Sequence, residues 1–540
     1  MKKIFLVLSV LALMVSATSC KTSSKVADKA VEQRDAKHEF RGAWIQTAWQ
    51  DRYQNKSPEA CRKYLSQLVE TLYQTGFNAI IFQVRPEGDA FYRSSYEPWS
   101  RFLTGQQGKA PQPEWDPMEY LIGLCHERGM EFHAWINPYR MYMSKNFNLA
   151  SNHLYRQHPE YFVVFDERLY LNPGLPESRA WIRSVVIDIV KRYDVDAIHM
   201  DDYFYPYPVA GKEFNDIATF QAYAPQMGFN ANSRSDLGNF RRRSVNILIK
   251  SVHDDIRALK PWVRFGISPF GIYRNEKSWE GGSKTNGTQC YDDLYADVLL
   301  WAQSGWIDYV IPQLYWEIGH KAADYTTLCA WWAKNIPSPC QLYIGQSIER
   351  SLDGAANSAS TPKLTVSSKN FLEKVNQARG EKNIKGNCFW YAYQVEDNQF
   401  GVRDFLKQSV YTTHSMPPTF SNLDDDAPGK VKDLDGSLVR KGEKVGLYLK
   451  WAEPKADKKD QNDPILYYNV YRFVKGEMVN TRDMDHLYMQ VASPELIDYD
   501  IANSSKYTYV VTAVDHYNNE GKAAKKTFKI KIKIRDSKGF

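Results

Sequence analysis

Short apolar runs alternate with amphipathic stretches along most of the chain, from residue 39 to about residue 412. Apolar runs of this length are typical of buried strands, and the stretches between them repeat apolar residues with the period of a helix that buries one face. We expect eight strands, near residues 39–46, 78–85, 131–137, 196–202, 263–269, 308–315, 341–346 and 387–393. The expected helices lie near residues 58–75, 117–128, 177–193, 235–260, 292–303, 323–334, 368–379 and 400–411.

The residues at the ends of the first two helices support this interpretation. Ser57-Pro58 and Asp116-Pro117 each place a capping side chain before a proline at the first helical position, and Gly76 and Gly129 lie where the helices should end. Strands that alternate with helices form a parallel sheet, and eight repeats favour closure. The sequence therefore predicts an α/β fold, a (β/α)₈ TIM barrel over residues 38–415.

A doubly wound open sheet is the structural alternative. Dinucleotide-binding sheets of that type carry a glycine-rich turn directly after the first strand. Here the first strand is followed by Thr47-Ala48-Trp49-Gln50, which has no glycine and cannot cradle a phosphate. The sequence therefore favours the barrel.

The pattern changes after residue 425, where short strands follow one another without a helical period. Residues 424–428 read as a linker, and Trp451 with residues 467–472 and 507–515 resembles strands B, C and F of a fibronectin type III sandwich. Tyr507 is a candidate for the tyrosine corner of that fold. We expect a small all-β fibronectin type III-like domain over residues 425–540 that serves as a spacer or weak binding platform.

The first 20 residues have the order of a secretory signal peptide. Lys2 and Lys3 precede an apolar run over residues 4–15 and four small residues before Cys20. This order resembles a relaxed bacterial lipobox, with Cys20 as the lipidated residue, and a plain secretory signal is the alternative. Residues 21–37 then form a tether. We expect an exported protein held at the outer membrane only by lipid, facing the periplasm; a cell-surface position stays open.

Composition excludes several classes of function. The net charge of +6 is spread over 540 residues, whereas a nucleic-acid groove needs clustered basic side chains. The six cysteines after Cys20 include no CxxC pair, which argues against metal knuckles and thioredoxin-like chemistry. We therefore expect no nucleic-acid partner, no cofactor and no metal.

Polar side chains recur at inward-facing positions near the ends of four predicted strands. Barrel enzymes carry their chemistry at the carboxyl ends of the strands. Each such residue alone has an ordinary explanation as a core hydrogen-bonding group or a loop anchor, but together they are too many to bury without a solvent-filled site. They are Gln83, Arg85, His133, Trp135, Asn137, His199, Asp201, Gln313, Tyr315 and Glu317.

Aromatic residues in the predicted loops point to carbohydrate, because sugars bind flat aromatic faces as well as planar hydrogen-bonding groups. Glycosidic cleavage usually takes two carboxyl groups. Asp201 is our first choice as nucleophile or base, and Glu317 is the best-placed acid because Tyr315 and Trp316 would desolvate it. Asp202 is the reserve for either role. Three other acidic residues near strand ends keep the acid open: Glu349, Glu396 and Asp397.

Five segments resemble the glycosyl-hydrolase-like 10 family, long called domain of unknown function 187: residues 40–44, 82–92, 133–139, 198–203 and 312–316. The resemblance implies a secreted or lipid-anchored glycoside hydrolase, and family members tied to a substrate act on peptidoglycan glycan strands stripped of stem peptides. It also implies a distant relation to α-amylase barrels, whose nucleophilic Asp ends the fourth strand, as Asp201 does. By the same motifs the substrate-binding residues are Arg85, Asp89, His133, Asn137, Tyr139, His199, Tyr203, Gln313, Tyr315 and Trp316.

Three hypotheses follow. The first is a glycoside hydrolase that acts on an envelope or dietary polysaccharide with Asp201 and Glu317 as the pair. The second is a non-catalytic glycan-binding lipoprotein with a degenerate barrel site. The third is a metal-dependent hydrolase that uses His133, His199 and Asp201, although no HExxH or similar ligand spacing supports it.

Overall fold

The structure is a computed structural model, and it describes residues 37–351, 368–454 and 464–532. The predicted signal peptide, the tether up to residue 36 and the predicted lipidation site Cys20 lie outside the described residues. Within the described ranges, every helix is too short or too polar to cross a membrane.

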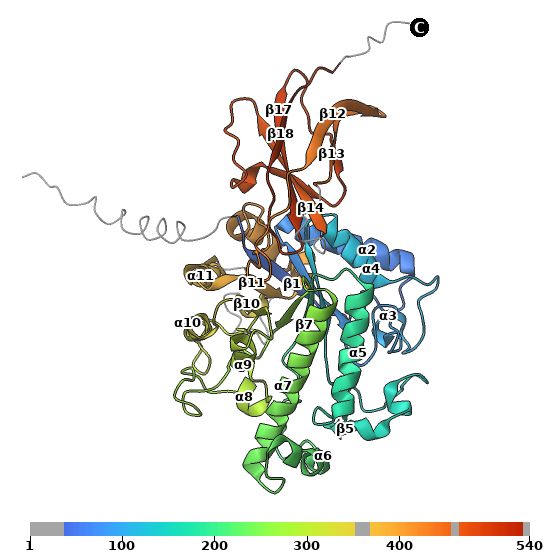
Figure 1. Ribbon diagram of the computed structural model, residues 1–540, viewed down its shortest axis with the longest axis vertical. Coiled ribbons are helices and arrows are strands. Elements are labelled where there is room, and N and C mark those ends of the chain that lie inside the picture. The colour runs from blue at the N-terminus through green and yellow to red at the C-terminus, as the bar shows by residue number, and fades with distance from the viewer. Residues whose placement is uncertain (1–36, 352–367, 455–463, 533–540) are drawn as a thin grey trace, which may run out of the picture. The chain divides into compact units, whose positions relative to one another are not determined.

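Eight parallel strands close into a barrel in the order β1-β11-β10-β9-β8-β7-β3-β2 (Figure 1). This confirms the (β/α)₈ prediction. Each strand has the short apolar pattern of a strand buried on both faces, since helices cover the outside and side chains fill the inside. The strands are β1 Phe40–Ile45, β2 Ala79–Arg85, β3 Glu131–Ile136, β7 Ala197–Met200, β8 Arg264–Ile267, β9 Tyr309–Val310, β10 Gln341–Ser347 and β11 Ile384–Trp390.

Helices follow the strands and surround the barrel. The predicted caps are present: the Ser57 hydroxyl accepts a hydrogen bond from the Ala60 N–H (3.2 Å), the Asp116 carboxylate accepts one from Met118 (3.0 Å), and Gly76 has a φ of 98°. The principal helices are α2 Pro58–Thr75, α4 Pro117–His126, α5 Pro176–Arg192, α7 Arg234–Leu259, α9 Val298–Gln303, α10 Tyr325–Asn335, α11 Ser368–Gly380, α12 Ala392–Glu396 and α13 Val402–Phe405. Shorter ones are α3 Arg101–Thr104, α6 Ile217–Tyr223 and α8 Cys290–Asp293.

Two regions differ from the sequence expectation. The single helix expected near residues 400–411 is the short helix α13 followed by a π-helical turn, Leu406–Val410. A small antiparallel sheet stands between β3 and α5, in the order β4-β6-β5, from β4 Arg140–Tyr142, β5 Phe162–Phe165 and β6 Arg168–Leu171. Its strands have only three or four residues, too few for an alternating pattern to be recognised in the sequence.

The C-terminal strands form two antiparallel sheets, in the orders β12-β13-β16 and β15-β14-β17-β18. The Tyr507 hydroxyl accepts a hydrogen bond from the backbone N–H of Ala502 (3.1 Å), which is the type of contact expected of a tyrosine corner. The strands are β12 Lys432–Lys441, β13 Lys444–Ala452, β14 Ile465–Val474, β15 Leu487–Val491, β16 Glu495–Asp498, β17 Lys506–Asp515 and β18 Ala524–Lys529.

The turn after β17 contacts the amino-terminal ends of barrel strands. Asn518 donates a side-chain hydrogen bond to Glu131 at the start of β3 (2.8 Å), and Arg264 at the start of β8 donates one to the backbone oxygen of His516 (2.8 Å). Arg264 and Glu131 also form a buried ion pair (2.9 Å). The C-terminal sheets therefore contact the barrel end that lies opposite the expected site.

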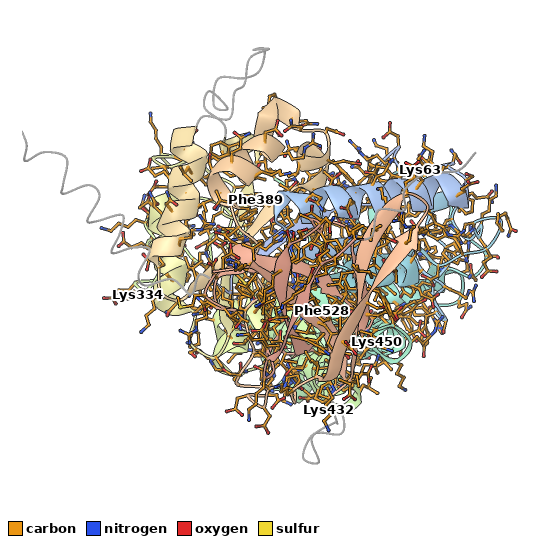
Figure 2. The ribbon with its side chains drawn as sticks, turned by 90° about the horizontal axis from the view of Figure 1, so that it is seen from above. Lys63, Lys334, Phe389, Lys432, Lys450 and Phe528 are labelled. Atoms are coloured by element: carbon orange, nitrogen blue, oxygen red, sulfur yellow. The ribbon has the colours of Figure 1, made fainter. Side chains whose placement is uncertain are left out.

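Apolar side chains fill the layer between barrel and helices. Figure 2 shows Lys63 of α2 and Lys334 of α10 projecting outward, whereas Phe389 of β11 is fully buried. All six cysteines of the described chain are buried and unbonded to one another, as expected of small core residues.

Candidate active site

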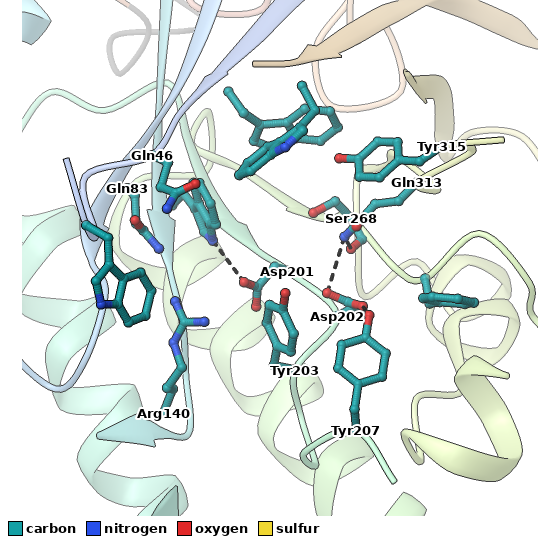
Figure 3. Close-up of a pocket in the computed structure, with 15 residues that line it drawn as sticks. Gln46, Gln83, Arg140, Asp201, Asp202, Tyr203, Tyr207, Ser268, Gln313 and Tyr315 are labelled. Carbon is teal, nitrogen blue, oxygen red and sulfur yellow. Dashed lines mark hydrogen bonds between the residues drawn. The ribbon is translucent and has the colours of Figure 1, made fainter. Parts of the chain in front are cut away.

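A cavity of about 380 Å³ opens at the carboxyl ends of the barrel strands (Figure 3). Its walls combine aromatic rings with carboxyl, amide, hydroxyl and guanidinium groups, a composition suited to a sugar. The lining residues are Trp44, Gln46, Trp49, Gln83, Trp135, Arg140, Asp201, Asp202, Tyr203, Tyr207, Ser268, Phe270, Gln313, Tyr315 and Trp390.

Asp201 directly follows β7 and faces inward, as the alternation along that strand predicts. Its Oδ2 accepts hydrogen bonds from the indole N–H of Trp135 (3.3 Å) and from the side-chain amide of Asn137. Its Oδ1 is buried and has no hydrogen-bond partner of good geometry among the described residues. Burial raises the pKa of Asp201 to about 7, against the opposing charge of Arg140 and with a contribution from Asp202.

Asp202 lies beside Asp201 and lines the same cavity (Figure 3). It accepts hydrogen bonds from the Tyr207 hydroxyl and from the Gln313 amide, the latter at 3.2 Å. Burial raises the pKa of Asp202 to about 6, and these two hydrogen bonds oppose the increase. The two neighbouring carboxyl groups therefore titrate as a pair close to neutral pH, where they share one proton.

Arg140 is the one cation among the described residues that line the cavity. Its guanidinium donates to the backbone oxygen of Pro86 (3.0 Å) and to the side-chain oxygen of Asn137 (2.8 Å), and it lies 5.3 Å from the ring centre of Tyr203. No ion pair joins it to any described carboxylate. Arg140 was not among the predicted site residues, although it directly follows the third-strand motif, because the strand that positions it, β4, was not predicted.

Tryptophan and tyrosine rings form the wall across the cavity from the carboxyl groups. Trp44 makes edge contacts with Tyr315 and Trp390, each with ring centres 6.4 Å apart. Trp49 stands at the rim, 54% exposed, with a φ of 54° that is rare for a bulky residue. Its ring lies on Phe102, with centres 5.2 Å apart, so a large apolar face is presented to solvent beside the cavity.

Several predicted substrate-binding residues are buried and do not line the cavity. Arg85 forms a two-point ion pair with Glu97 (2.6 and 2.7 Å) instead of facing Asp201. Asp89 accepts hydrogen bonds from the backbone of Arg101 and the side chain of Gln107, both at 3.3 Å. Tyr139 is 1% exposed. The β2 register shifts between Gln83 and Arg85, which ends the simple alternation that predicted an inward Arg85.

Glu317, the predicted acid, is also not among the residues that line the cavity. It lies half-buried on the loop before α10, where its backbone oxygen accepts hydrogen bonds from His320 and Tyr325 (both 3.3 Å). Trp316 packs against the cavity residue Phe270, with ring centres 5.5 Å apart. Strand β9 ends at Val310, so the chain has left the strand well before Glu317 and alternation no longer decides its direction.

His133 and His199 point into the barrel beneath the cavity. Their Nδ1 atoms lie 2.8 and 3.0 Å from the hydroxyl of Tyr309. The other ring nitrogen of His133 lies 2.8 Å from Glu131, and that of His199 lies 2.9 Å from Ser268. Burial holds the pKa of His199 well below its ordinary value, so this ring is neutral and supplies no charge to Asp201. The part of the chain that the structure describes contains no cluster of three metal-ligating side chains.

Comparison with known proteins identifies the family. The model of the family "Glycosyl hydrolase-like 10" matches residues 39–360. The chain is 36% identical to glycosyl hydrolase YngK of Bacillus subtilis over 503 residues, 91% of this chain and 93% of that protein. It is 37% identical to glycosyl hydrolase DigH of Escherichia coli K12 over 51% of this chain, and spans 63% of that protein's length. The chain belongs to the glycosyl hydrolase-like 10 family, as its motifs indicated.

Proposed function

We propose that this protein hydrolyses glycosidic bonds in a bacterial cell-envelope glycan. The observation that carries the proposal is the pair Asp201 and Asp202, whose carboxyl groups have raised pKa values at the strand ends of a sugar-sized, aromatic-walled cavity. Carboxyl groups that exchange a proton near neutral pH are what general acid–base catalysis of glycoside cleavage requires. Asp202 replaces Glu317 as the acid in this proposal because it lines the cavity.

The proposed substrate is a peptidoglycan glycan strand without stem peptides. Removal of the stem peptide from a muramic acid residue leaves a free lactyl carboxylate. Arg140 is a cavity-lining cation that has no ion-pair partner among the described residues, and a guanidinium is well suited to bind a carboxylate. Attachment through Cys20 to the outer membrane, facing the periplasm, would place the enzyme beside this glycan and belongs to the same proposal.

The test combines activity with binding. The protein is incubated with stripped glycan strands, with peptidoglycan that retains its stem peptides, and with common polysaccharides, and new reducing ends and pull-down are both measured. We expect new ends from stripped strands and fewer from strands with stem peptides. Binding without new ends from any glycan would instead support a non-catalytic glycan-binding lipoprotein.

Variants that replace a carboxyl group by an amide test which residues have catalytic roles. Asp201→Asn and Asp202→Asn are each expected to lower the hydrolysis rate by about 10²–10⁴-fold while strand binding persists. Asp425→Asn, at an exposed position of the linker, is the matched control. Glu317→Gln is expected to remain active. Full activity of Asp201→Asn would refute the assignment, and loss of activity in Glu317→Gln but not in Asp202→Asn would return the acid role to Glu317.

A further inference from the structure

The two carboxyl groups of the cavity come from consecutive residues at the end of one strand. In the usual two-carboxylate mechanisms the groups flank the scissile bond, so that one protonates the leaving oxygen while the other acts on the opposite face of the sugar. In the order of this barrel, the strand directly across from β7 is β11, which ends in Trp390. Among the described residues that line the cavity, no third carboxylate faces the pair.

The hydrogen-bond partners give the two aspartates different chemistry. An indole N–H and an amide N–H can only donate, so the partners of Asp201, Trp135 and Asn137, favour an ionised acceptor. Asp202 also has a donor-only partner, the Gln313 amide at its Oδ1 (3.2 Å). Its Oδ2 meets the Tyr207 hydroxyl, which can donate or accept, so this oxygen can carry a proton as well as a charge.

Before a ligand binds, the pKa of Asp201, about 7, is the higher of the two, so the shared proton lies mainly on Asp201. Asp201 has a buried Oδ1 that accepts no side-chain hydrogen bond, and a ligand N–H donated to this oxygen would favour the ionised form of Asp201 and transfer the shared proton to Asp202.

We propose that the nucleophile is the carbonyl oxygen of the substrate's own 2-acetamido group, with Asp201 accepting the acetamido N–H and Asp202 acting as acid and then base. This inference rests on the proposed glycosidase function and specifies a 2-acetamido sugar in the cavity. It explains how a site with both carboxyl groups on one side can cleave the bond, because the missing group is supplied by the substrate.

The bond changes balance without a cofactor. The acetamido oxygen bonds to C1 as the bond from C1 to the leaving oxygen breaks, and the proton of Asp202 passes to that oxygen. The resulting oxazolinium cation keeps its N–H on the ionised Asp201. Asp202 then takes a proton from a water molecule whose oxygen bonds to C1, the bond between C1 and the acetamido oxygen breaks, and the amide is restored. One water is consumed and the configuration at C1 is retained.

The decisive experiment changes the nucleophile without changing the protein. Stripped glycan strands are compared in their native form and after replacement of the N-acetyl groups by N-trifluoroacetyl groups, which makes the carbonyl oxygen a poor nucleophile. We expect the native strands to be hydrolysed with retention of the configuration at C1, which NMR of the product measures. We expect the fluorinated strands not to be hydrolysed. As the control, the fluorinated strands are tested in pull-down. If they bind as well as the native strands, the loss of hydrolysis reflects the weaker nucleophile and not weaker binding.

The outcomes separate the two proposals. Inversion, or equal cleavage of native and fluorinated strands, would overturn substrate assistance and leave the glycosidase function standing. Absence of new reducing ends from every glycan would overturn both.

Two variants test the roles on native strands. Asp202→Asn is expected to lower the hydrolysis rate by about 10²–10⁴-fold. The remaining rate should no longer fall as the pH rises, because the titrating acid is missing. Asp201→Asn is expected to lower the rate but to keep this fall at high pH, because the acid is still present. The reverse pattern would exchange the two roles, and an unchanged fall in both variants would contradict the acid role of the pair. Thermal unfolding of each variant confirms that it is folded.

Discussion

At the scale of single residues, burial and hydrogen-bond partners decide the chemistry of the cavity. Asp201 and Asp202 are both almost completely buried, 3% and 2% exposed, yet each keeps hydrogen-bond donors that permit a charged form. Arg140 further favours that form, since its charge opposes the increase in both pKa values. Burial raises the pKa values of the pair and these donors lower them, and the balance keeps both pKa values near the pH at which the pair must give and take a proton.

The raised pKa values predict a narrow pH optimum. Above about pH 7 the pair loses its shared proton, so the acid is missing, and below about pH 6 both groups are protonated, so Asp201 cannot accept a hydrogen bond from the substrate. We expect kcat/KM on glycan strands to be greatest between these limits and to fall about tenfold per pH unit outside them. A rate that stays constant to about pH 9 would contradict a titrating acid in this range.

Trp49 is expected to bind the glycan outside the cavity. Because its exposed ring lies at the rim, Trp49→Ala should raise KM for long strands by roughly 3- to 10-fold, the loss of one aromatic contact, and leave kcat unchanged. Steady-state kinetics measures both constants. Trp279→Ala is the matched control, since Trp279 is 38% exposed but does not line the cavity. An equal change in both variants would indicate a general surface effect.

At the scale of elements, the barrel interior below the cavity is organised by Tyr309 of β9. Its hydroxyl joins His133 of β3 to His199 of β7, and its ring occupies the space above Gly266 of β8. A Cβ atom at Gly266 would lie 2.0 Å from the Tyr309 ring. The missing side chain at this position therefore lets three strands share one aromatic residue.

Gly266→Ala is expected to lower the free energy of unfolding by about 1–3 kcal/mol, because the added methyl group forces Tyr309 from its position. Denaturant unfolding measures the change. Gly123→Ala in α4 is the control: it has no atom within 4 Å of the added Cβ, and alanine stabilises an exposed helical position by up to about 1 kcal/mol. Equal destabilisation by both substitutions would rule out the steric explanation.

At the scale of the whole molecule, the ion pair Glu131–Arg264 joins barrel strands β3 and β8 at the end where the C-terminal sheets make contact, since Glu131 accepts a hydrogen bond from Asn518 and Arg264 donates one to His516. Burial disfavours the charge of Glu131, but Arg264 and His133 outweigh it and hold the pKa of Glu131 below its ordinary value. A lowered carboxyl pKa contributes stability that is present above the ordinary value of about 4.3 and is lost as the pH falls through the folded-state value.

Glu131→Gln should therefore destabilise the protein by about 3–5 kcal/mol at neutral pH, because Arg264 stays buried without its partner. The deficit relative to wild type should shrink as the pH is lowered below about 4, where wild-type Glu131 is itself protonated. Thermal unfolding across pH provides the measurement. Asp435→Asn, which removes an exposed pair with Lys526, is expected to leave stability almost unchanged, because solvent screens this pair. A deficit that persists unchanged in acid would contradict the electrostatic origin.

Local patterns were enough to predict the barrel. The signals that predict it act over only a few residues, so they can be recognised in the sequence. They are the strand and helix periods, the capping residues Ser57 and Asp116, and the turn at Gly76. The same alternation placed Asp201, Gln83 and Asn137 inside. It failed where the chain departs from a regular strand, at the β2 register shift before Arg85 and beyond the short β9 that precedes Glu317.

The sequence by itself therefore determined the repeated strand–helix units and the inward direction of Asp201, since each depends on short-range stereochemistry, and the count of eight units indicated a closed barrel. Only the tertiary structure decided that Arg140 and Asp202 join Asp201 in the cavity, that Arg85 is paired with Glu97, and that Tyr309 holds His133 and His199 below it. The physical reason is that these contacts depend on the packing of loops and strands from different parts of the chain, which no local period encodes.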